Sequence, residues 1–168
     1  MGYWGYYVVG RGAQPLDGTD ALAAVRGELG LLERRADGWQ VWECRDVEEG
    51  TSIGSMNALA SETGAPALFG YVMDSACVVV EAAAPSGGGW TACLDRASMA
   101  DHIGGDERAL EDYFLVPEDA ADRAVAWAAE AGMTVTAGPL VEVLSAPAEP
   151  SAEELFFRFL ERLGVVRL

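Results

Sequence analysis

Three apolar segments between residues 67 and 94 constrain the fold of this chain more than any other feature. Residues 67–74 (ALFGYVMD) and 76–84 (ACVVVEAAA) are typical of strands, and the turn between them must be tight. Residues 90–94 (WTACL) form another strand after the turn PSGGG. Because short turns join antiparallel neighbours, we predict a three-stranded antiparallel meander over residues 67–94. The segment 76–84 is almost continuously apolar, which predicts a central strand.

The rest of the chain mixes strand and helix patterns without a steady alternation of the two. Further strands are expected at residues 3–10, 39–45 and 133–138. Helices are expected at residues 20–35, 54–63, 96–103, 106–114, 117–131 and 151–163, while residues 140–146 fit either structure. We therefore predict a single α+β domain over residues 1–168, with a mainly antiparallel sheet of about five to six strands and helices packed on it. A short proline-containing linker at 147–150 precedes the last helix.

The charge of the chain excludes one class of partner and favours another. The formal net charge is −16, from 27 acidic and 11 basic residues, and every basic residue is an arginine. Nucleic-acid binding needs clustered basic side chains, and the longest basic run here is the pair Arg34–Arg35. A basic protein partner fits, because a field of this size would attract it. The lack of lysine is also typical of a GC-rich bacterial genome, which gives part of the acidity a second explanation.

The cysteines and the apolar runs predict a reducing compartment. Cys44, Cys77 and Cys93 lie in apolar, strand-like stretches, and their spacing matches no metal or redox motif. We expect them to be reduced and buried, as in a cytoplasmic protein. The first residues lack the features of a signal peptide, and no apolar run approaches the roughly 20 residues that span a bilayer. The sequence therefore predicts a cytoplasmic protein with no membrane partner and no cofactor.

The segment Gly50–Gly54 matches G-x-S-x-G, the turn that exposes a nucleophilic serine. Ser52 would be the nucleophile, and His102, the one histidine, lies downstream. Acidic residues directly before the turn argue against catalysis, because they would oppose a developing oxyanion. The alternative is a polar turn in which Thr51 or Ser52 caps the following helix. We therefore expect no catalytic triad and keep Ser52 and His102 as the candidates.

Acidic side chains gather around His102, which makes a metal site conceivable from composition. Asp101, His102 and Asp106 are the candidate ligands. Asp101 and His102 are adjacent, so on a helix their side chains diverge by about 100°. The alternative is a solvated helix end, and we predict no metal site.

Aromatic side chains near the first strand allow two interpretations. Five of them are candidate binding residues: Tyr3, Trp4, Tyr6, Trp39 and Trp42. Strand alternation makes both faces of residues 3–10 bulky and apolar, which predicts a strand buried on both sides. The alternative is a partner-binding patch, since tyrosine and tryptophan are enriched where interfaces derive most of their affinity.

Glu81 stands in the most apolar strand of the sequence. A buried carboxylate should be paired, and in a cleft it would be a candidate functional group. The alternatives are an exposed strand end, or pairing with an arginine such as Arg96.

No motif in the chain specifies one activity, so three hypotheses remain. The first is a non-catalytic protein-binding module resembling an inhibitor, antitoxin or immunity protein. The second is a small enzyme or ligand-binding protein whose pocket uses Glu81, Asp74, Tyr71 or the His102 region. The third is a subunit that functions only as a homo-oligomer, with the aromatic strand or the last helix at the interface.

Overall fold

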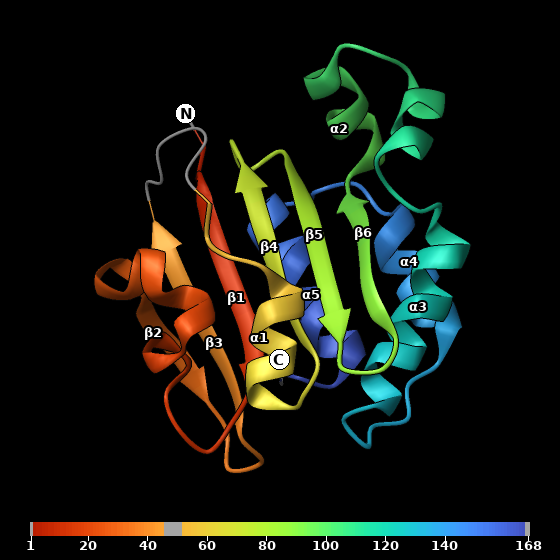
Figure 1. Ribbon diagram of the computed structural model, residues 1–168. Coiled ribbons are helices and arrows are strands. Elements are labelled where there is room, and N and C mark those ends of the chain that lie inside the picture. The colour runs from red at the N-terminus through yellow and green to blue at the C-terminus, as the bar shows by residue number, and fades with distance from the viewer. Residues whose placement is uncertain (1, 46–51, 167–168) are drawn as a thin grey trace.

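A computed structural model describes residues 2–45 and 52–166 of the chain. Within these residues six strands form one antiparallel sheet in the order β2-β3-β1-β4-β5-β6 (Figure 1). The strands are β1 (Gly5–Arg11), β2 (Gly30–Arg34), β3 (Trp39–Arg45), β4 (Ala67–Met73), β5 (Cys77–Ala84) and β6 (Gly88–Leu94). The helices are η1 (Leu16–Gly18), η2 (Asp20–Glu28), α1 (Met56–Thr63), α2 (Arg96–Ile103), η3 (Glu107–Asp112), α3 (Pro117–Ala129), α4 (Ala137–Ser145) and α5 (Ala152–Leu163), where η marks a 3₁₀ helix.

The predicted α+β class and the antiparallel meander are confirmed. Strands β4, β5 and β6 are neighbours in the sheet, as the short turns between them require. The β4–β5 turn is tight: Asp74 and Ser75 both have φ of 53°, and the Ala76 amide donates to the Met73 carbonyl. The sixth strand, however, is not the one that the sequence suggested.

Two predicted elements are wrong. The helix expected at 20–35 is a 3₁₀ helix that ends at Glu28, after non-helical dihedrals at Val25, and residues 30–34 form the edge strand β2. The strand expected at 133–138 is absent from the described sheet. Residues 133–136 instead connect α3 to α4, which begins at Ala137 and has Pro139 in its first turn, where a missing amide hydrogen is tolerated.

One face of the sheet is covered continuously by α3, α4 and α5. Trp127 of α3 stacks on Trp39 of β3 at 5.5 Å between ring centroids, and its indole N–H donates to the Ala67 and Ala83 carbonyls. Phe156 of α5 packs over Gly70 of β4, where a side chain would clash with the phenyl ring. We call this side the closed face. The apolar side chains of α5 are thus buried against the sheet: Leu155, Phe156, Phe159, Leu160 and Leu163.

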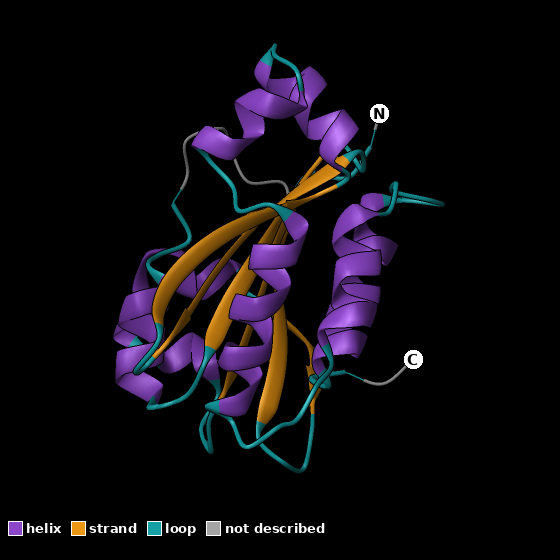
Figure 2. Ribbon diagram, turned by 90° about the vertical axis from the view of Figure 1, so that its right-hand side faces the viewer, coloured by secondary structure: helices purple, strands orange, loops and turns teal. Residues whose placement is uncertain are grey.

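The opposite face has two separate covers. Helices η1, η2 and α1 bury Val8, Trp42 and Leu59 at one end of the strands. The α2–η3 segment buries Cys77, Cys93 and their neighbours at the other end, and Figure 2 shows it projecting beyond the sheet. We call this side the divided face. All three cysteines are buried free thiols, as expected.

The first strand lies inside the sheet, between β3 and β4. Tyr7 and Val9 pack on the closed face, whereas Tyr6 and Val8 lie on the divided face. This placement confirms the prediction of a strand that is apolar on both sides. Among the described residues, no helix has both the length and the apolar character to cross a bilayer.

Candidate functional site

A strip of partly buried side chains crosses the divided face between its two covers. Phe69, Glu81 and Thr91 stand opposite one another on β4, β5 and β6 and form one row. The next row contains Tyr6, Tyr71 and Val79, which pair across β1, β4 and β5. Each of these six side chains is neither fully buried nor fully exposed. We call them the sheet strip, and they lie where the cover of α1 ends and that of α2–η3 begins.

Aromatic rings make up half of the sheet strip. Tyr6 stacks on Tyr71 with ring centroids 4.5 Å apart, and it meets Phe69 edge to face at 5.2 Å. Trp4 continues the series beside Tyr71, with a centroid distance of 6.4 Å and 39% of its surface exposed. Such a surface can pack the apolar part of a ligand and attract a cation to a ring face.

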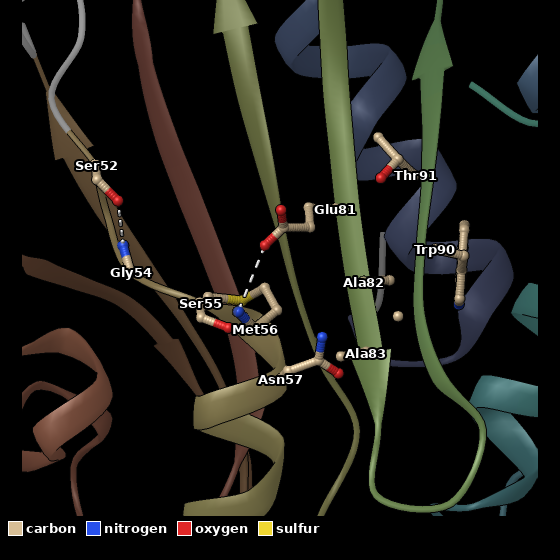
Figure 3. Close-up of a pocket in the computed structure, with 11 residues that line it drawn as sticks. Ser52, Gly54, Ser55, Met56, Asn57, Glu81, Ala82, Ala83, Trp90 and Thr91 are labelled. Carbon is tan, nitrogen blue, oxygen red and sulfur yellow. Dashed lines mark hydrogen bonds between the residues drawn. The ribbon is translucent and has the colours of Figure 1, made fainter. Parts of the chain in front are cut away.

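A pocket of about 470 Å³ lies at the Glu81 end of the strip, beside the start of α1. Its polar lining includes Ser52, Ser55, Asn57, Glu81 and Thr91, from the loop before α1, from α1 and from the β5–β6 hairpin (Figure 3). Five polar side chains on three separate segments therefore converge on one small volume, as in small-ligand and side-chain binding sites.

Local sequence explains how the loop before α1 reaches this position. Gly54 has φ of 116°, and any side chain there would clash with the carbonyl oxygen of Ala21 in η2. Ser55 then caps α1, because its hydroxyl accepts a hydrogen bond from the Ala58 amide at 3.3 Å. The alternative prediction of a cap at Thr51 or Ser52 is wrong, since the cap is Ser55 and the Ser52 hydroxyl accepts from the Gly54 amide instead.

Glu81 is weakly bonded for a half-buried carboxylate. The Met56 amide donates to it across 3.4 Å, and this is its one hydrogen bond within the described residues. No arginine of the same residues lies within ion-pair distance of Glu81. Arg96, the partner that the sequence suggested, donates instead to the Leu115 carbonyl. The Glu81 carboxylate is thus held near the positive end of α1 with most of its acceptor capacity available.

The charge of Glu81 acts electrostatically on the neighbouring ring of Tyr6. The pKa of the Tyr6 hydroxyl lies above its usual value, chiefly because the ring is removed from water. Electrostatic repulsion from Tyr71, Cys44 and Glu81 raises the Tyr6 pKa further. The strip is therefore an environment that disfavours additional negative charge.

The structure does not join Ser52 to His102. Ser52 lines the Glu81 pocket, whereas His102 is exposed in the last turn of α2. No hydrogen bond or ion pair connects the two across the described ranges, and the Gly50 and Thr51 part of the G-x-S-x-G motif lies outside them. The described residues therefore do not bring these two candidates of a catalytic triad together. The acidic residues at 46, 48 and 49, on which the objection to catalysis rested, lie outside the described residues.

The candidate metal ligands are distributed along an exposed segment. Asp101 and His102 project from α2, and Asp106 uses its carboxylate to cap η3 by accepting from the Arg108 and Ala109 amides. In the described part of the chain, no group of three or more potential ligands could hold a metal ion. Glu81 likewise has no second carboxylate among the described residues that line its pocket.

The five candidate aromatic residues occupy three different environments. Trp39 is buried on the closed face and Trp42 on the divided face, so neither belongs to a surface patch. Tyr3 is half-buried, and its hydroxyl donates to Glu43 at 2.7 Å. Trp4 and Tyr6 are the two that reach the strip. Sequence reasoning missed Phe69, Val79 and Thr91, although their alternation with buried neighbours along β4, β5 and β6 is visible in the sequence.

The arginines stabilise loops more often than they neutralise carboxylates. Seven of them donate to backbone carbonyl groups: Arg11, Arg26, Arg34, Arg35, Arg96, Arg123 and Arg158. Among the residues that the structure describes, three ion pairs occur, joining Arg35 to Asp37, Arg45 to Glu43 and Arg162 to Glu161. Most carboxylates therefore retain their charge toward solvent.

Acidic residues are dense on the segment beside the strip. Five exposed acids lie on or next to α2 and η3: Asp101, Asp106, Glu107, Glu111 and Asp112. Tyr113 follows directly and is 65% exposed, the largest exposure among the large apolar and aromatic side chains described. The same segment packs its apolar side near Tyr71 and Val79, so this acidic surface adjoins the sheet strip.

Comparison of the chain with protein-family models, curated proteins and solved structures gave no match.

Proposed function

We propose that this protein is a non-catalytic binding module for a basic protein, comparable in role to an inhibitor, an antitoxin or an immunity protein. The observation that carries the proposal is the excess of carboxylates over cations. The chain has 27 acidic and 11 basic residues, and three ion pairs occur among the described residues, so most carboxylates have no cation at contact distance. A field of this size accelerates association with a positively charged partner and disfavours anionic ones.

The acidic α2–η3 segment and the sheet strip support the proposal in different ways. Exposed acids such as Glu111 and Asp112 provide long-range attraction, which salt screens. Tyr113 and Trp4 provide exposed aromatic area of the type that is enriched in interface hot spots. A basic partner would therefore be attracted by charge and held by contacts at the strip and its border.

A capture experiment tests this function. The tagged protein is mixed with lysate of the organism that encodes it, at low salt and at about 0.5 M salt, where the Debye length is roughly 4 Å. We expect a stoichiometric basic protein at low salt, identified by mass spectrometry, whose purified form binds again with a strongly salt-dependent association rate. Absence of any stoichiometric partner at low salt, or a partner without excess basic residues, would contradict the proposal.

A second candidate function is favoured by the pocket itself. Ser52, Ser55, Asn57, Glu81 and Thr91 would suit a small polar molecule, on which the protein would act as a receptor or an enzyme. A small-molecule screen read by thermal shift separates the two functions. A neutral or anionic metabolite that raises the melting temperature of the wild type, but not of a Thr91→Val variant, would favour this second candidate.

A further inference from the structure

We propose that the Glu81 pocket is a receptor for one arginine side chain of the partner, with the guanidinium on the Glu81 carboxylate and the methylene stem on the sheet strip. This inference rests on the proposed function, because it specifies how a basic protein would be recognised. It concerns the chemistry of the group that enters the pocket, and it can fail while capture of a basic protein still occurs.

The state of the Glu81 carboxylate indicates a cationic ligand. Its one hydrogen bond among the described residues, from the Met56 amide, is long at 3.4 Å, and no arginine of those residues pairs with it. A half-buried carboxylate of this kind pays part of its desolvation cost without the compensation of a full ion pair. An incoming cation supplies that compensation, whereas a phosphate or carboxylate would meet repulsion at the same position.

The described residues around Glu81 do not form a site for a divalent metal. Hard cations such as Ca²⁺ take six or more oxygen ligands and are held by several carboxylates. Among the described residues that line the pocket, Glu81 is the one acid, and the other polar groups are hydroxyls and an amide. Across the described ranges no cluster of three potential ligands exists either. An organic cation, which needs one counter-charge and several neutral acceptors, matches this set better.

The arrangement favours guanidinium over ammonium. A guanidinium has five donors in a planar fork, and two of them fit the two oxygens of a carboxylate. Thr91 stands directly across from Glu81 in the β5–β6 register, and Asn57 projects from the start of α1 toward β5 beside Ala83, in the same pocket lining (Figure 3). These neutral groups can accept hydrogen bonds from the three guanidinium donors that the carboxylate leaves free. An ammonium has three donors in all, so it would leave some of these acceptors without a partner.

The sheet strip supplies the contact for the arginine stem. Phe69 stands opposite Glu81 on β4, and residues opposite each other in this way have Cβ atoms about 4.5–5.5 Å apart. Tyr71 and Val79 extend the apolar surface in the next row. A side chain that enters the pocket from this direction therefore packs its methylene groups on the strip while its charged end reaches Glu81.

Two model compounds test the proposal directly. N-acetyl-arginine methylamide and N-acetyl-lysine methylamide are titrated into ¹⁵N- and methyl-labelled protein, and binding is followed by NMR. We expect saturable shifts at Phe69, Val79 and Thr91 with the arginine compound, and at least fivefold weaker binding of the lysine compound. Equal binding of the two compounds, or shifts confined to other regions, would overturn the assignment of a guanidinium site.

Matched variants separate the pocket from general charge. Glu81→Gln removes the carboxylate with little change in shape, and Glu142→Gln removes the same charge from the exposed surface of α4, on the closed-face side. We expect the arginine compound to bind Glu81→Gln at least tenfold more weakly and Glu142→Gln within twofold of wild type. Equal losses in both variants would overturn the site. Thermal unfolding of each variant confirms that both remain folded.

The same variants distinguish failure of this site from failure of the proposed function. If wild type and Glu81→Gln capture a basic protein equally well, the binding function stands and the arginine receptor is wrong. If wild type captures no basic protein, the proposed function is wrong, whatever the model compounds show.

Discussion

The two faces of the sheet differ in how their polar groups are treated. On the closed face, three helices cover an apolar cluster. The carboxylates at its border are bonded: Glu43 accepts from the Tyr3 hydroxyl and pairs with Arg45, and Glu153 accepts from the Ser75 hydroxyl through one of its two oxygens. The divided face contains both Gln40 and Glu81. Gln40 is buried and fully engaged: its carbonyl oxygen accepts from the Leu16 amide and the Trp42 indole, and its amide donates to the Gly12 and Gln14 carbonyls.

Glu81 on the same face has one long hydrogen bond to the described residues, even though it is more difficult to bury than a neutral amide. Gln40 has a partner for each of its polar atoms, whereas Glu81 lies at the interruption between two helical covers with one long hydrogen bond from the described residues. An incoming guanidinium at the proposed site would supply the partner that Glu81 lacks.

The largest expected effect concerns packing on the two faces. Phe156→Ala on the closed face should lower the free energy of unfolding by about 3–5 kcal/mol, because the fully buried ring leaves a cavity under α5. Phe69→Ala in the strip should cost clearly less, about 1–2 kcal/mol, because its ring is already partly in water. Urea unfolding measures both losses of unfolding free energy. Equal losses would mean that Phe69 is packed as tightly as Phe156, and that the two faces do not differ in this respect.

A smaller effect concerns pH and the α2–η3 cover. Burial raises the pKa of the Cys77 and Cys93 thiols to about 11, from an ordinary value of 9. Each thiol therefore binds its proton more tightly in the folded protein, and this stabilisation is complete below pH 9. It is lost as pH rises from 9 toward 11. Denaturant unfolding across this range should show decreasing stability.

A Cys77→Ala, Cys93→Ala double variant is the control for this pH dependence. Its absolute stability will differ, but its decrease between pH 9 and 11 should be shallower than that of wild type. An unchanged slope would mean that other groups, such as the buried tyrosines, account for the whole effect.

The smallest effect tests the electrostatic contact within the strip. The Glu81 charge raises the pKa of Tyr6, although burial is the larger cause. Glu81→Gln should therefore lower the Tyr6 pKa modestly while leaving it above its ordinary value of 10. Titration of ¹³C-labelled tyrosine by NMR measures the change, and Glu111→Gln is the control. An unchanged Tyr6 pKa would mean that Glu81 and Tyr6 do not interact electrostatically, which would contradict the description of the strip as one site.

Local patterns in the sequence predicted the elements whose residues carry one clear pattern. The meander over 67–94 follows from short turns, and the helix expected at 151–163 begins after Ser151, whose hydroxyl accepts from the Glu154 amide. Residues 20–35 show why another region failed. Leu22, Val25, Leu29 and Leu32 have helical spacing, yet the backbone leaves the helix and Leu31 pairs with Trp42 of β3, the next strand along the chain. Strand pairing overrode the local helical period.

The candidate site was predictable in part. The position of Glu81 in an apolar strand identified it as unusual from the sequence alone. Its neighbours could not be identified, because Phe69 and Thr91 meet it through the register of two strand pairs, and Ser55 and Asn57 approach through the packing of α1. One shift of register would move these side chains to the opposite face.

The excess of carboxylates also determines how dissolved ions act on this protein. Since the net charge is −16 and few carboxylates of the described residues have an arginine at ion-pair distance, the folded chain experiences net self-repulsion, which is relieved when counter-ions accumulate around it. Added salt should therefore make folding more favourable while it weakens capture of a basic partner. Ionic strength therefore acts on folding and on partner binding in opposite directions. The protein would bind its partner best at low salt, where repulsion among its own charges lowers the stability of the fold most.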